Sequence, residues 1–510
     1  MATVGFSLAD YIVFAAMLSL SVAIGIYYGC TGKKQSTTSE YLLADRRMNY
    51  VPVSFSIMAS FVSAIGLLGA PAEVYTYGWI YWMGIWCFAI AIPISAHLYL
   101  PVFYKLQVTS IYEYLEVRFN SATRLLGTCL YIFYKTTYLS VAVYAPALAL
   151  SVVSGLNVWL TSSTVAVVCV FYTTLGGMKA VVWTDVLQSL IMFAGILAVI
   201  IQGCIDLGGG SIAWQIAEEG GRIYFTDWSL DPTVRHTMWS IFIGLTLGYL
   251  PIYGISQATA QRFCSCPSVR DGQKALYLSL PIVMSINSLL CFCGVVMYAT
   301  YAKCDPLGAG FVEVADQRMA YFIADKFARL PGFSGLFLSA ICSAALSTLS
   351  SGLHSLSAVT LEDLIKKSTC ASAMTDKKAT MISKGLCIMY GLVALALVLV
   401  VSQMGLILQL ALSLGNLILA PVFAMFTLGI FFPWTNSIGV IVGALAGIAV
   451  AMVILIGKFI YPPSWPMLSL STEECFLAST ASNYTNLLTS PEMTTMSLGT
   501  TTEGELSSAA

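Results

Sequence analysis

The chain has 510 residues, of which 58% are hydrophobic and 10% are charged, and its formal net charge is −1. Soluble domains carry about 25% charged residues, so this composition excludes an ordinary water-soluble enzyme. The near-zero net charge provides no basic surface, and we therefore expect no nucleic-acid partner.

Twelve apolar segments follow one another along the chain. A hydrocarbon core about 30 Å thick requires about 20 apolar residues in a helix. Segments of this kind cover residues 8–29, 50–72, 78–103, 124–150, 156–175, 183–207, 236–260, 275–302, 333–360, 381–403, 405–432 and 435–460. The sequence therefore predicts an all-α polytopic protein with about twelve transmembrane helices in a lipid bilayer. The first segment has no Lys or Arg before it and no clear cleavage site, so we expect it to be retained.

The Lys and Arg residues fall mainly on one side of this arrangement. If the N-terminus lies outside the cell, sixteen of them fall in inner loops and six in outer loops. Cytoplasmic loops retain positive charge, so this imbalance predicts an extracellular N-terminus. An even number of spans then places the C-terminal tail outside as well.

The tail, residues 461–510, contains no Lys or Arg and is rich in Ser and Thr, so we expect it to be disordered. It carries the triplet Asn483-Tyr484-Thr485, which makes Asn483 a candidate glycosylation site. Cys304 and Cys475 both fall on the outer side. In that oxidising compartment they form either a disulfide or two free thiols.

Two of the segments contain residues that interrupt helices. Small residues fill the stretch Ala59–Pro71, and Gly and Pro residues recur in Gly244–Gln257. The two segments lie five spans apart, so they cross the membrane in opposite directions. This is typical of two inverted five-helix repeats, each beginning with a discontinuous helix that lines a central site. Alternatively, the small residues only allow helices to pack closely.

Oxygen atoms without a net charge are suitable ligands for a hard cation inside a membrane. Ser347 and Thr348 lie in the middle of segment 333–360, and a broken helix would free carbonyl groups at Ser63 and Gly66. Together they could bind sodium. The alternative is that the two hydroxyls bond to carbonyls of their own helix.

Three further polar side chains lie in or near apolar segments. Asp185 and Gln188, near the cytoplasmic end of segment 183–207, either bind or steer a second sodium ion or form a solvated helix end. Lys135 is the one cation near the middle of an apolar segment. It could pair with an anionic substrate, or it could extend its ammonium toward the membrane surface or helix carbonyls.

Several motifs resemble those of a known family. The runs Gly176–Asp185, Leu346–Thr348 and Ala358–Lys366 are similar to the signature of the sodium/solute symporter family. Within it, the chain most resembles the branch of sodium-coupled monocarboxylate transporters, the sodium/iodide symporter and the sodium-dependent multivitamin transporter. The motifs of this branch are found at Gly69–Tyr75, Tyr144–Leu148, Arg235–Trp239 and Cys304–Pro306. The resemblance extends over about residues 8–470.

The resemblance implies the inverted five-helix-repeat sodium symporter fold with one leading helix. By position, the main sodium site would comprise the carbonyls of Ser63, Gly66 and Ala344 and the hydroxyls of Ser347 and Thr348. Asp185 and Gln188 match residues linked to sodium handling. Substrate-cavity positions correspond to Phe61, Gly66, Tyr144, Tyr249 and Tyr253, to which Lys135 is added as the isolated cation.

The resemblance also divides the chain. We expect the N-terminus, leading helix and first cytoplasmic loop in residues 1–49, and the first five-helix repeat in 50–207. An extracellular loop covers 208–235, the inverted second repeat covers 236–432, an additional helix covers 433–460, and the tail covers 461–510. The chain ends before the last helix of the branch, so we expect a shortened form or an incomplete piece.

Some residues depart from the pattern of the branch. Gly66 occupies a position where relatives that move anions often carry a hydroxyl or an amide, and Ala344-Ala345 replaces a Gly-Thr pair. The departures leave the main sodium site intact and make the substrate and a second sodium ion less certain to follow the family.

The function expected from these features is sodium-coupled import of a small organic anion across the plasma membrane by alternating access. Short-chain monocarboxylates such as lactate, pyruvate or nicotinate are the first choice. The alternatives are iodide, a vitamin such as biotin or pantothenate, or an uncoupled sodium leak through the same fold. Sodium would be a co-transported ion, and the oligomeric state is not predicted. The three His residues have no metal-ligand spacing, so no enzyme activity is expected.

Overall fold

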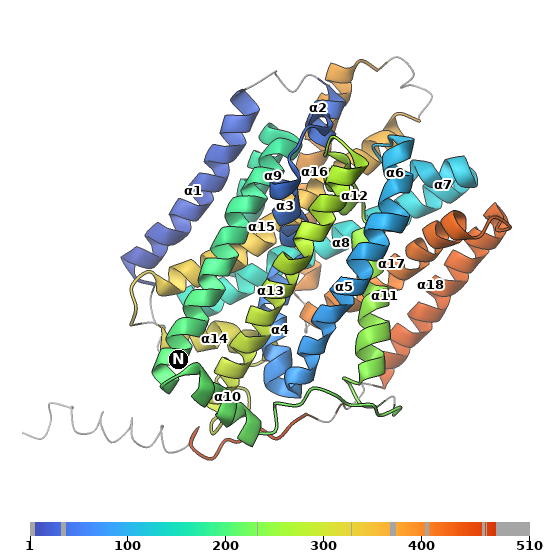
Figure 1. Ribbon diagram of the computed structural model, residues 1–510. Coiled ribbons are helices and arrows are strands. Elements are labelled where there is room, and N and C mark those ends of the chain that lie inside the picture. Colours follow the sequence, from blue (N-terminus) through green and yellow to red (C-terminus); the bar gives the residue numbers. More distant parts are fainter. Residues whose placement is uncertain are drawn as a thin grey trace, which may run out of the picture.

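The computed structural model describes residues 6–31, 37–231, 233–327, 329–367, 374–402, 407–461, 465 and 467–475. Fourteen of the described helices form a single bundle (Figure 1). They are α1 (Leu8–Cys30), α3 (Tyr50–Phe61), α4 (Ala64–Tyr77), α5 (Ile85–Ile94), α6 (Leu100–Leu106), α8 (Ser121–Ser154), α9 (Val158–Leu207), α11 (Thr246–Gly254), α12 (Gln257–Cys264), α13 (Val269–Tyr301), α15 (Phe333–Val359), α16 (Asp376–Val401), α17 (Ile407–Phe431) and α18 (Ser437–Ile460).

The two ends of the bundle carry different short elements. One end, called the α2 face, carries α2 (Thr38–Leu43) and α7 (Glu113–Arg118), at the top of Figure 1. The other end, called the disulfide face, carries α10 (Gly210–Glu219) and the red segment 467–475. The short helix α14 (Arg318–Lys326) follows α13 in the chain.

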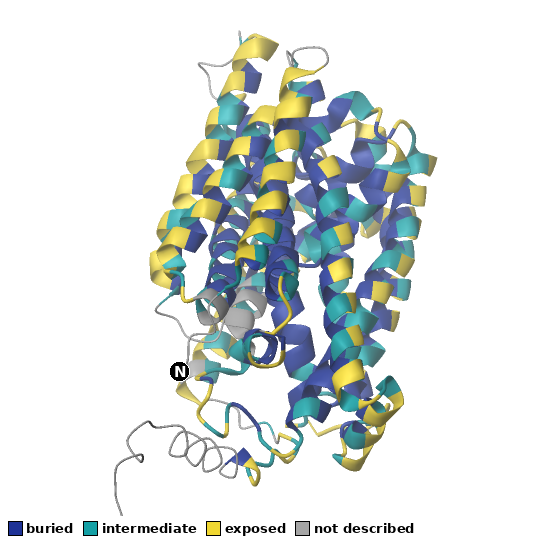
Figure 2. Ribbon diagram, turned by 90° about the vertical axis from the view of Figure 1, so that its left-hand side faces the viewer, coloured by how far each residue is buried: buried dark blue, intermediate teal, exposed yellow. Residues whose placement is uncertain are grey.

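Burial separates a central helix from peripheral ones. The most apolar window of α15, including its short extension to Ile365, is 94% buried, whereas the corresponding windows of α1 and α18 are 22% and 11% buried. Figure 2 shows the same distribution, with exposed residues along the outer helices and buried residues inside. Because the outer helices expose apolar side chains, this surface suits a hydrocarbon environment.

Seven described helices are long and apolar enough to cross a membrane, or up to nine if each of two bent pairs counts as one span. This number is lower than twelve partly because α9 alone covers the two predicted segments 156–175 and 183–207. A straight helix of 50 residues would be about 75 Å long, which is more than twice the hydrocarbon thickness. Gly177 interrupts α9 with φ 59° and ψ −157°. A Cβ there would lie 2.8 Å from the Tyr41 ring, so glycine satisfies both the conformation and the packing.

Both segments with interrupting residues are bent. The pair α3 and α4 bends by 62°, and α11, with the turn that precedes it, bends by 51° relative to α12. The breaks fall at Val62–Ser63 and Ile255–Ser256. The prediction of discontinuous helices in segments 50–72 and 236–260 is therefore confirmed.

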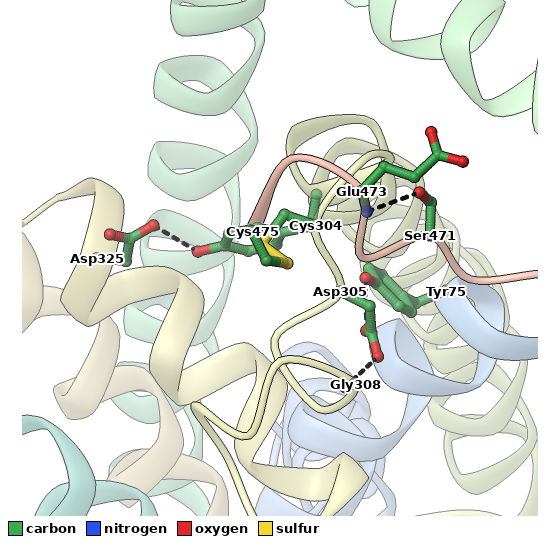
Figure 3. The surroundings of a disulfide bond; sticks show 9 residues. Tyr75, Cys304, Asp305, Gly308, Asp325, Ser471, Glu473 and Cys475 are labelled. Atoms are coloured by element: carbon green, nitrogen blue, oxygen red, sulfur yellow. Dashed lines mark hydrogen bonds between the residues drawn. A yellow bond between two sulfur atoms is a disulfide. The ribbon is translucent and has the colours of Figure 1, made fainter. Parts of the chain in front are cut away.

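Part of the predicted tail is held against the bundle. Cys304 and Cys475 form a disulfide with an S–S distance of 2.08 Å, which decides between the two alternatives (Figure 3). The segment 467–475 also accepts and donates backbone hydrogen bonds, so the expected disorder does not extend over this part. Asn483 lies outside the described residues.

Candidate functional site

The break between α3 and α4 consists of residues that leave the helical conformation. Val62 (φ −76°, ψ 94°) follows α3, and Ser63 (φ −89°, ψ 167°) precedes α4. The Ser63 side chain caps no N–H group of α4, while its carbonyl accepts the Leu67 N–H at 3.1 Å. A Cβ placed on Gly66 would meet no atom within 4 Å. The first turn of α4 therefore borders open space.

Two hydroxyl groups on α15 are buried without a partner. Ser347 and Thr348 have no exposed surface, and neither hydroxyl has a hydrogen-bond partner among the described residues. Ser350 and Ser351 differ, because both donate to the Ser347 carbonyl, at 3.1 and 2.6 Å. Bonding within the helix thus accounts for that pair and not for Ser347 and Thr348. Ala344 is buried one turn earlier on α15, against which both α3 and α4 pack.

Asp185 forms a buried ion pair that connects four helices. Its Oδ2 lies 3.0 Å from Nη2 of Arg262 on α12 and accepts the Ser56 hydroxyl of α3. The Arg262 guanidinium also donates to Ser56 Oγ at 2.7 Å, to the Ala258 carbonyl at 2.8 Å and to the Ser351 hydroxyl of α15. Arg262 and Asp185 are 1% and 0% exposed. The pair therefore ties the parts of both broken helices nearer the α2 face, α3 and α12, to α9 and α15.

Some polar atoms beside this ion pair remain free. Asp185 Oδ1 and both amide atoms of Gln188 have no hydrogen-bond partner within the described part of the chain, and both residues have no exposed surface. The Asp185 carboxyl lies close to the Ser347 hydroxyl. Unpartnered oxygen atoms from α9 and α15 are thus near one another, which fits a cation ligand set.

Aromatic rings from three helices gather at Phe61, the last residue of α3 before the break. Phe61 contacts the rings of Phe88, Tyr249 and Tyr253 at centroid distances of 5.2, 5.5 and 5.6 Å. Phe88 stacks on Tyr249 at 4.2 Å. Tyr253 is 1% exposed, and its hydroxyl has no partner among the residues that the structure describes. The cluster presents apolar walls with one free phenol group.

Lys135 and Tyr144 lie on α8, outside this ring cluster. Lys135 is 8% exposed and forms no ion pair with any described carboxylate, but its Nζ lies 5.2 Å from the Tyr138 ring centroid. Tyr138 in turn interacts with Ser63 at the break. Tyr144 is half-buried, and no described ring contact joins it to Phe61, Tyr249 or Tyr253. The structure thus places Lys135 one turn from a residue that contacts the break.

Sequence reasoning missed two residues of this region. It counted Arg262 as a charge in an inner loop, because a topology count cannot distinguish a buried arginine near a helix end from an exposed one. The carboxylate of Asp185 in an apolar segment could have indicated such a buried arginine, since a buried charge requires a partner of opposite charge. Phe88 lies in the uniformly apolar run Ile85–Ile94, where nothing marks one residue as different.

Comparisons with known proteins show the family of this chain. The profile of the sodium:solute symporter family matches residues 41–447. The chain belongs to this family. Members of the family are transporters and not enzymes, so the sodium:solute symporter described here is a multi-pass membrane protein that couples solute transport to sodium. Sodium is accordingly a co-transported ion.

Two relatives of this symporter are named after different substrates. It is 43% identical to the human sodium-coupled monocarboxylate transporter 1 over 488 residues, which are 95% of this chain and 79% of the relative. It is 42% identical to a rabbit sodium-dependent multivitamin transporter over 457 residues, which cover 89% of this chain and 71% of that one.

A solved structure supports the fold. An outward-open, substrate-bound structure of a Na⁺-coupled sialic acid symporter aligns with a TM-score of 0.78 at 22% identity, covering 90% of this chain and 100% of that one.

Proposed function

We propose that this symporter imports a small organic monoanion, with short-chain monocarboxylates such as lactate, pyruvate or nicotinate as the preferred class. The substrate class rests on the 43% identity to the human sodium-coupled monocarboxylate transporter 1. The observation that carries the proposed sodium site is the pair of buried hydroxyls of Ser347 and Thr348 on the helix that packs against α3 and α4. With the carbonyls of Ser63, Gly66 and Ala344 they provide five oxygen ligands without net charge. Sodium bound there ties α4 to α15 and favours the state that accepts substrate.

A second sodium ion would use Asp185 and Gln188. The free Asp185 Oδ1 and the free Gln188 amide support this assignment. Arg262 already pairs with the other carboxylate oxygen, so the local charge is balanced before an ion arrives. Each net positive charge moved inward gains about 2.3 kcal/mol per 100 mV of membrane potential, so two sodium ions with one monoanion would make uptake electrogenic.

The substrate would lie beside the aromatic cluster. Gly66 leaves space next to Phe61, Tyr249 and Tyr253, and the rings offer flat walls to a small planar anion. Tyr144 would line the cavity from α8, on a part of its wall outside the ring cluster. Lys135 supplies the positive charge that a carboxylate requires.

Replacing Lys135 by methionine is expected to weaken anionic substrates more than neutral analogues of the same shape. Methionine keeps a long, flexible side chain and removes only the charge. We expect the half-saturating concentration of the anion to rise by about tenfold, which corresponds to one lost charge-assisted hydrogen bond. Competition of labelled substrate by nicotinate and by nicotinamide measures the difference. An equal loss for both compounds would remove Lys135 from the substrate site.

Tyr253→Phe is expected to raise the half-saturating substrate concentration about fivefold to tenfold without lowering the amount of protein at the cell surface. The Tyr253 hydroxyl has no described protein partner, so its removal costs no internal hydrogen bond, whereas a substrate carboxylate would lose one. Tyr390→Phe provides the control, because it removes a buried phenol that is not part of this cluster and that pairs with Thr360 Oγ1 at 2.7 Å. Unchanged substrate affinity in Tyr253→Phe would show that the phenol does not contact substrate.

The orientation that we propose places the disulfide face and both termini outside the plasma membrane. The charge imbalance between loops and the Cys304–Cys475 disulfide support it, because disulfides persist in oxidising compartments. Asn483 is then a candidate glycosylation site, and a loss of apparent mass after glycosidase treatment, absent in Asn483→Gln, would test it.

A vitamin is the second candidate substrate, because the multivitamin relative is nearly as similar as the monocarboxylate one. A panel of labelled lactate, pyruvate, nicotinate, biotin, pantothenate and iodide, each with and without sodium, tests the assignment in cells that express the chain. We expect saturable uptake of the first three that disappears without sodium. Sodium-dependent uptake of biotin or iodide alone would replace the monocarboxylate assignment.

A further inference from the structure

The end of α4 at the disulfide face is fixed by groups from elsewhere in the chain. The last carbonyls of any helix lack partners within it. The Tyr75 carbonyl accepts Arg222 Nε at 3.4 Å, the Thr76 carbonyl accepts the Leu468 N–H at 3.3 Å, and the Tyr77 carbonyl accepts the Tyr224 hydroxyl at 2.7 Å. One of the three donors therefore comes from the segment that follows α18.

The same segment also holds the residues that surround this helix end. Arg222 Nη2 donates to the Ser469 carbonyl at 2.6 Å, and the Asp305 N–H donates to the Ser471 carbonyl at 2.8 Å. Asp305 accepts the Tyr75 hydroxyl at 2.8 Å, close to the disulfide in Figure 3. Arg222 and Asp305 are 1% and 2% exposed, so water does not compete for these bonds.

A second contact reaches the side of α4. Glu73 receives two hydrogen bonds from Arg235, at 2.5 and 3.1 Å. The Arg235 guanidinium lies over two rings, 4.5 Å from the Tyr77 centroid and 4.7 Å from the Trp465 centroid. Trp465 thus contacts the arginine that holds Glu73.

The disulfide anchors the far end of this segment. Cys475 bonds to Cys304, directly after α13, and the Glu474 carboxylate lies 2.8 Å from Lys303 Nζ. The Glu474 hydrogen bond raises the pKa of Lys303 above its usual value. Trp465 and residues 467–475, called the strap below, therefore connect α4 to the residues that follow α13.

We propose that the strap positions α4 and thereby sets the sodium affinity of the site at the other end of that helix. This inference rests on the proposed sodium site at Ser63 and Gly66. Since α4 extends from the break to the strap and packs against α15, freeing its far end allows other positions of Ser63 and Gly66 relative to Ser347 and Thr348. Apparent affinity falls in proportion to the fraction of molecules in the competent position.

Substitutions that remove the disulfide or the Trp465 ring test the proposal. We expect Cys475→Ser and Trp465→Ala to raise the half-saturating sodium concentration about fivefold or more, as is typical for coupled sites, with little change in maximal uptake per surface molecule. Trp434→Ala is the matched control, because Trp434 is 78% exposed between α17 and α18. A role in folding alone would lower surface abundance and leave the sodium dependence unchanged, and that result would overturn the proposal.

A membrane-impermeant reductant provides a test that does not depend on the folding of a variant. Applied to cells that already carry the wild-type symporter at their surface, it should reproduce the effect of Cys475→Ser. It should have no effect on the double variant Cys304→Ser/Cys475→Ser. Reduction that leaves the sodium dependence of the wild-type protein unchanged would also overturn the proposal.

A final measurement separates this inference from the proposed function. Hydrogen exchange of residues 64–79 in the purified protein should accelerate about fivefold or more on reduction, whatever the substrate is. If the wild-type chain shows no sodium-dependent uptake, the proposed function fails. If uptake is present but reduction changes neither sodium dependence nor exchange, the strap proposal fails alone.

Discussion

The double variant Ser347→Ala/Thr348→Ala is expected to lose sodium-dependent uptake while it reaches the cell surface in normal amounts. The Thr348 hydroxyl has no described protein partner and the Ser347 hydroxyl lies near the Asp185 carboxyl alone, so their removal should cost the fold little. A bound cation would lose two ligands, each worth about 1.5–3 kcal/mol, so sodium affinity should fall by roughly a hundredfold or more. The measurement is uptake against sodium concentration, normalised to biotinylated surface protein.

Ser339→Ala is the matched control for this experiment. Ser339 lies on the same helix and is equally buried, but its hydroxyl donates to the Gly335 carbonyl at 2.7 Å. Its removal should leave the sodium dependence unchanged. A double variant at Ser347 and Thr348 with wild-type half-saturating sodium would exclude these hydroxyls as ligands.

Arg262→Gln is expected to destabilise the folded protein by about 3–5 kcal/mol, because it leaves the Asp185 carboxylate buried without its counter-charge. The expected result is a lower unfolding temperature in detergent and little protein at the cell surface. Asp185→Asn alone should be similarly harmful, since it leaves Arg262 unpaired.

The double variant Asp185→Asn/Arg262→Gln tests whether the two residues stabilise the protein through their ion pair or independently of each other. We expect it to be more stable than Arg262→Gln, because both buried charges are then absent. The coupling free energy from the double-mutant cycle should then exceed the cost of Asp185→Asn alone, so it should be about 3 kcal/mol or more. Additive losses would show that the ion pair contributes nothing beyond its two members. Lys274→Gln/Asp271→Asn offers a matched surface pair, with side chains 60% and 26% exposed, and should change stability little.

The sequence was sufficient to predict the broken helices. Interruptions occur where small residues replace bulky ones, and the structure breaks at Val62–Ser63 and Ile255–Ser256. The prediction that Cys304 and Cys475 lie on the same side was also correct, since they form a disulfide. These features depend on local composition and on counting spans, both of which can be read directly along the chain.

Contacts between distant segments could not be predicted in the same way. Arg262 was counted with the loop charges, yet it is buried among four helices. Segment 467–475 reads as part of a polar tail, yet its backbone bonds to Thr76 and Asp305. In both cases the decisive information is which groups of the folded chain lack partners. That property emerges only when the helices are packed together.

Accumulation in proteoliposomes tests most directly whether this chain couples sodium to an organic anion. The purified protein is reconstituted, and an inward sodium gradient is imposed in the presence of labelled lactate or nicotinate. We predict transient accumulation above the external concentration that increases with an inside-negative potential and is absent in the Ser347→Ala/Thr348→Ala variant. Sodium entry without substrate, or anion entry that only equilibrates and ignores the gradient, would contradict the account.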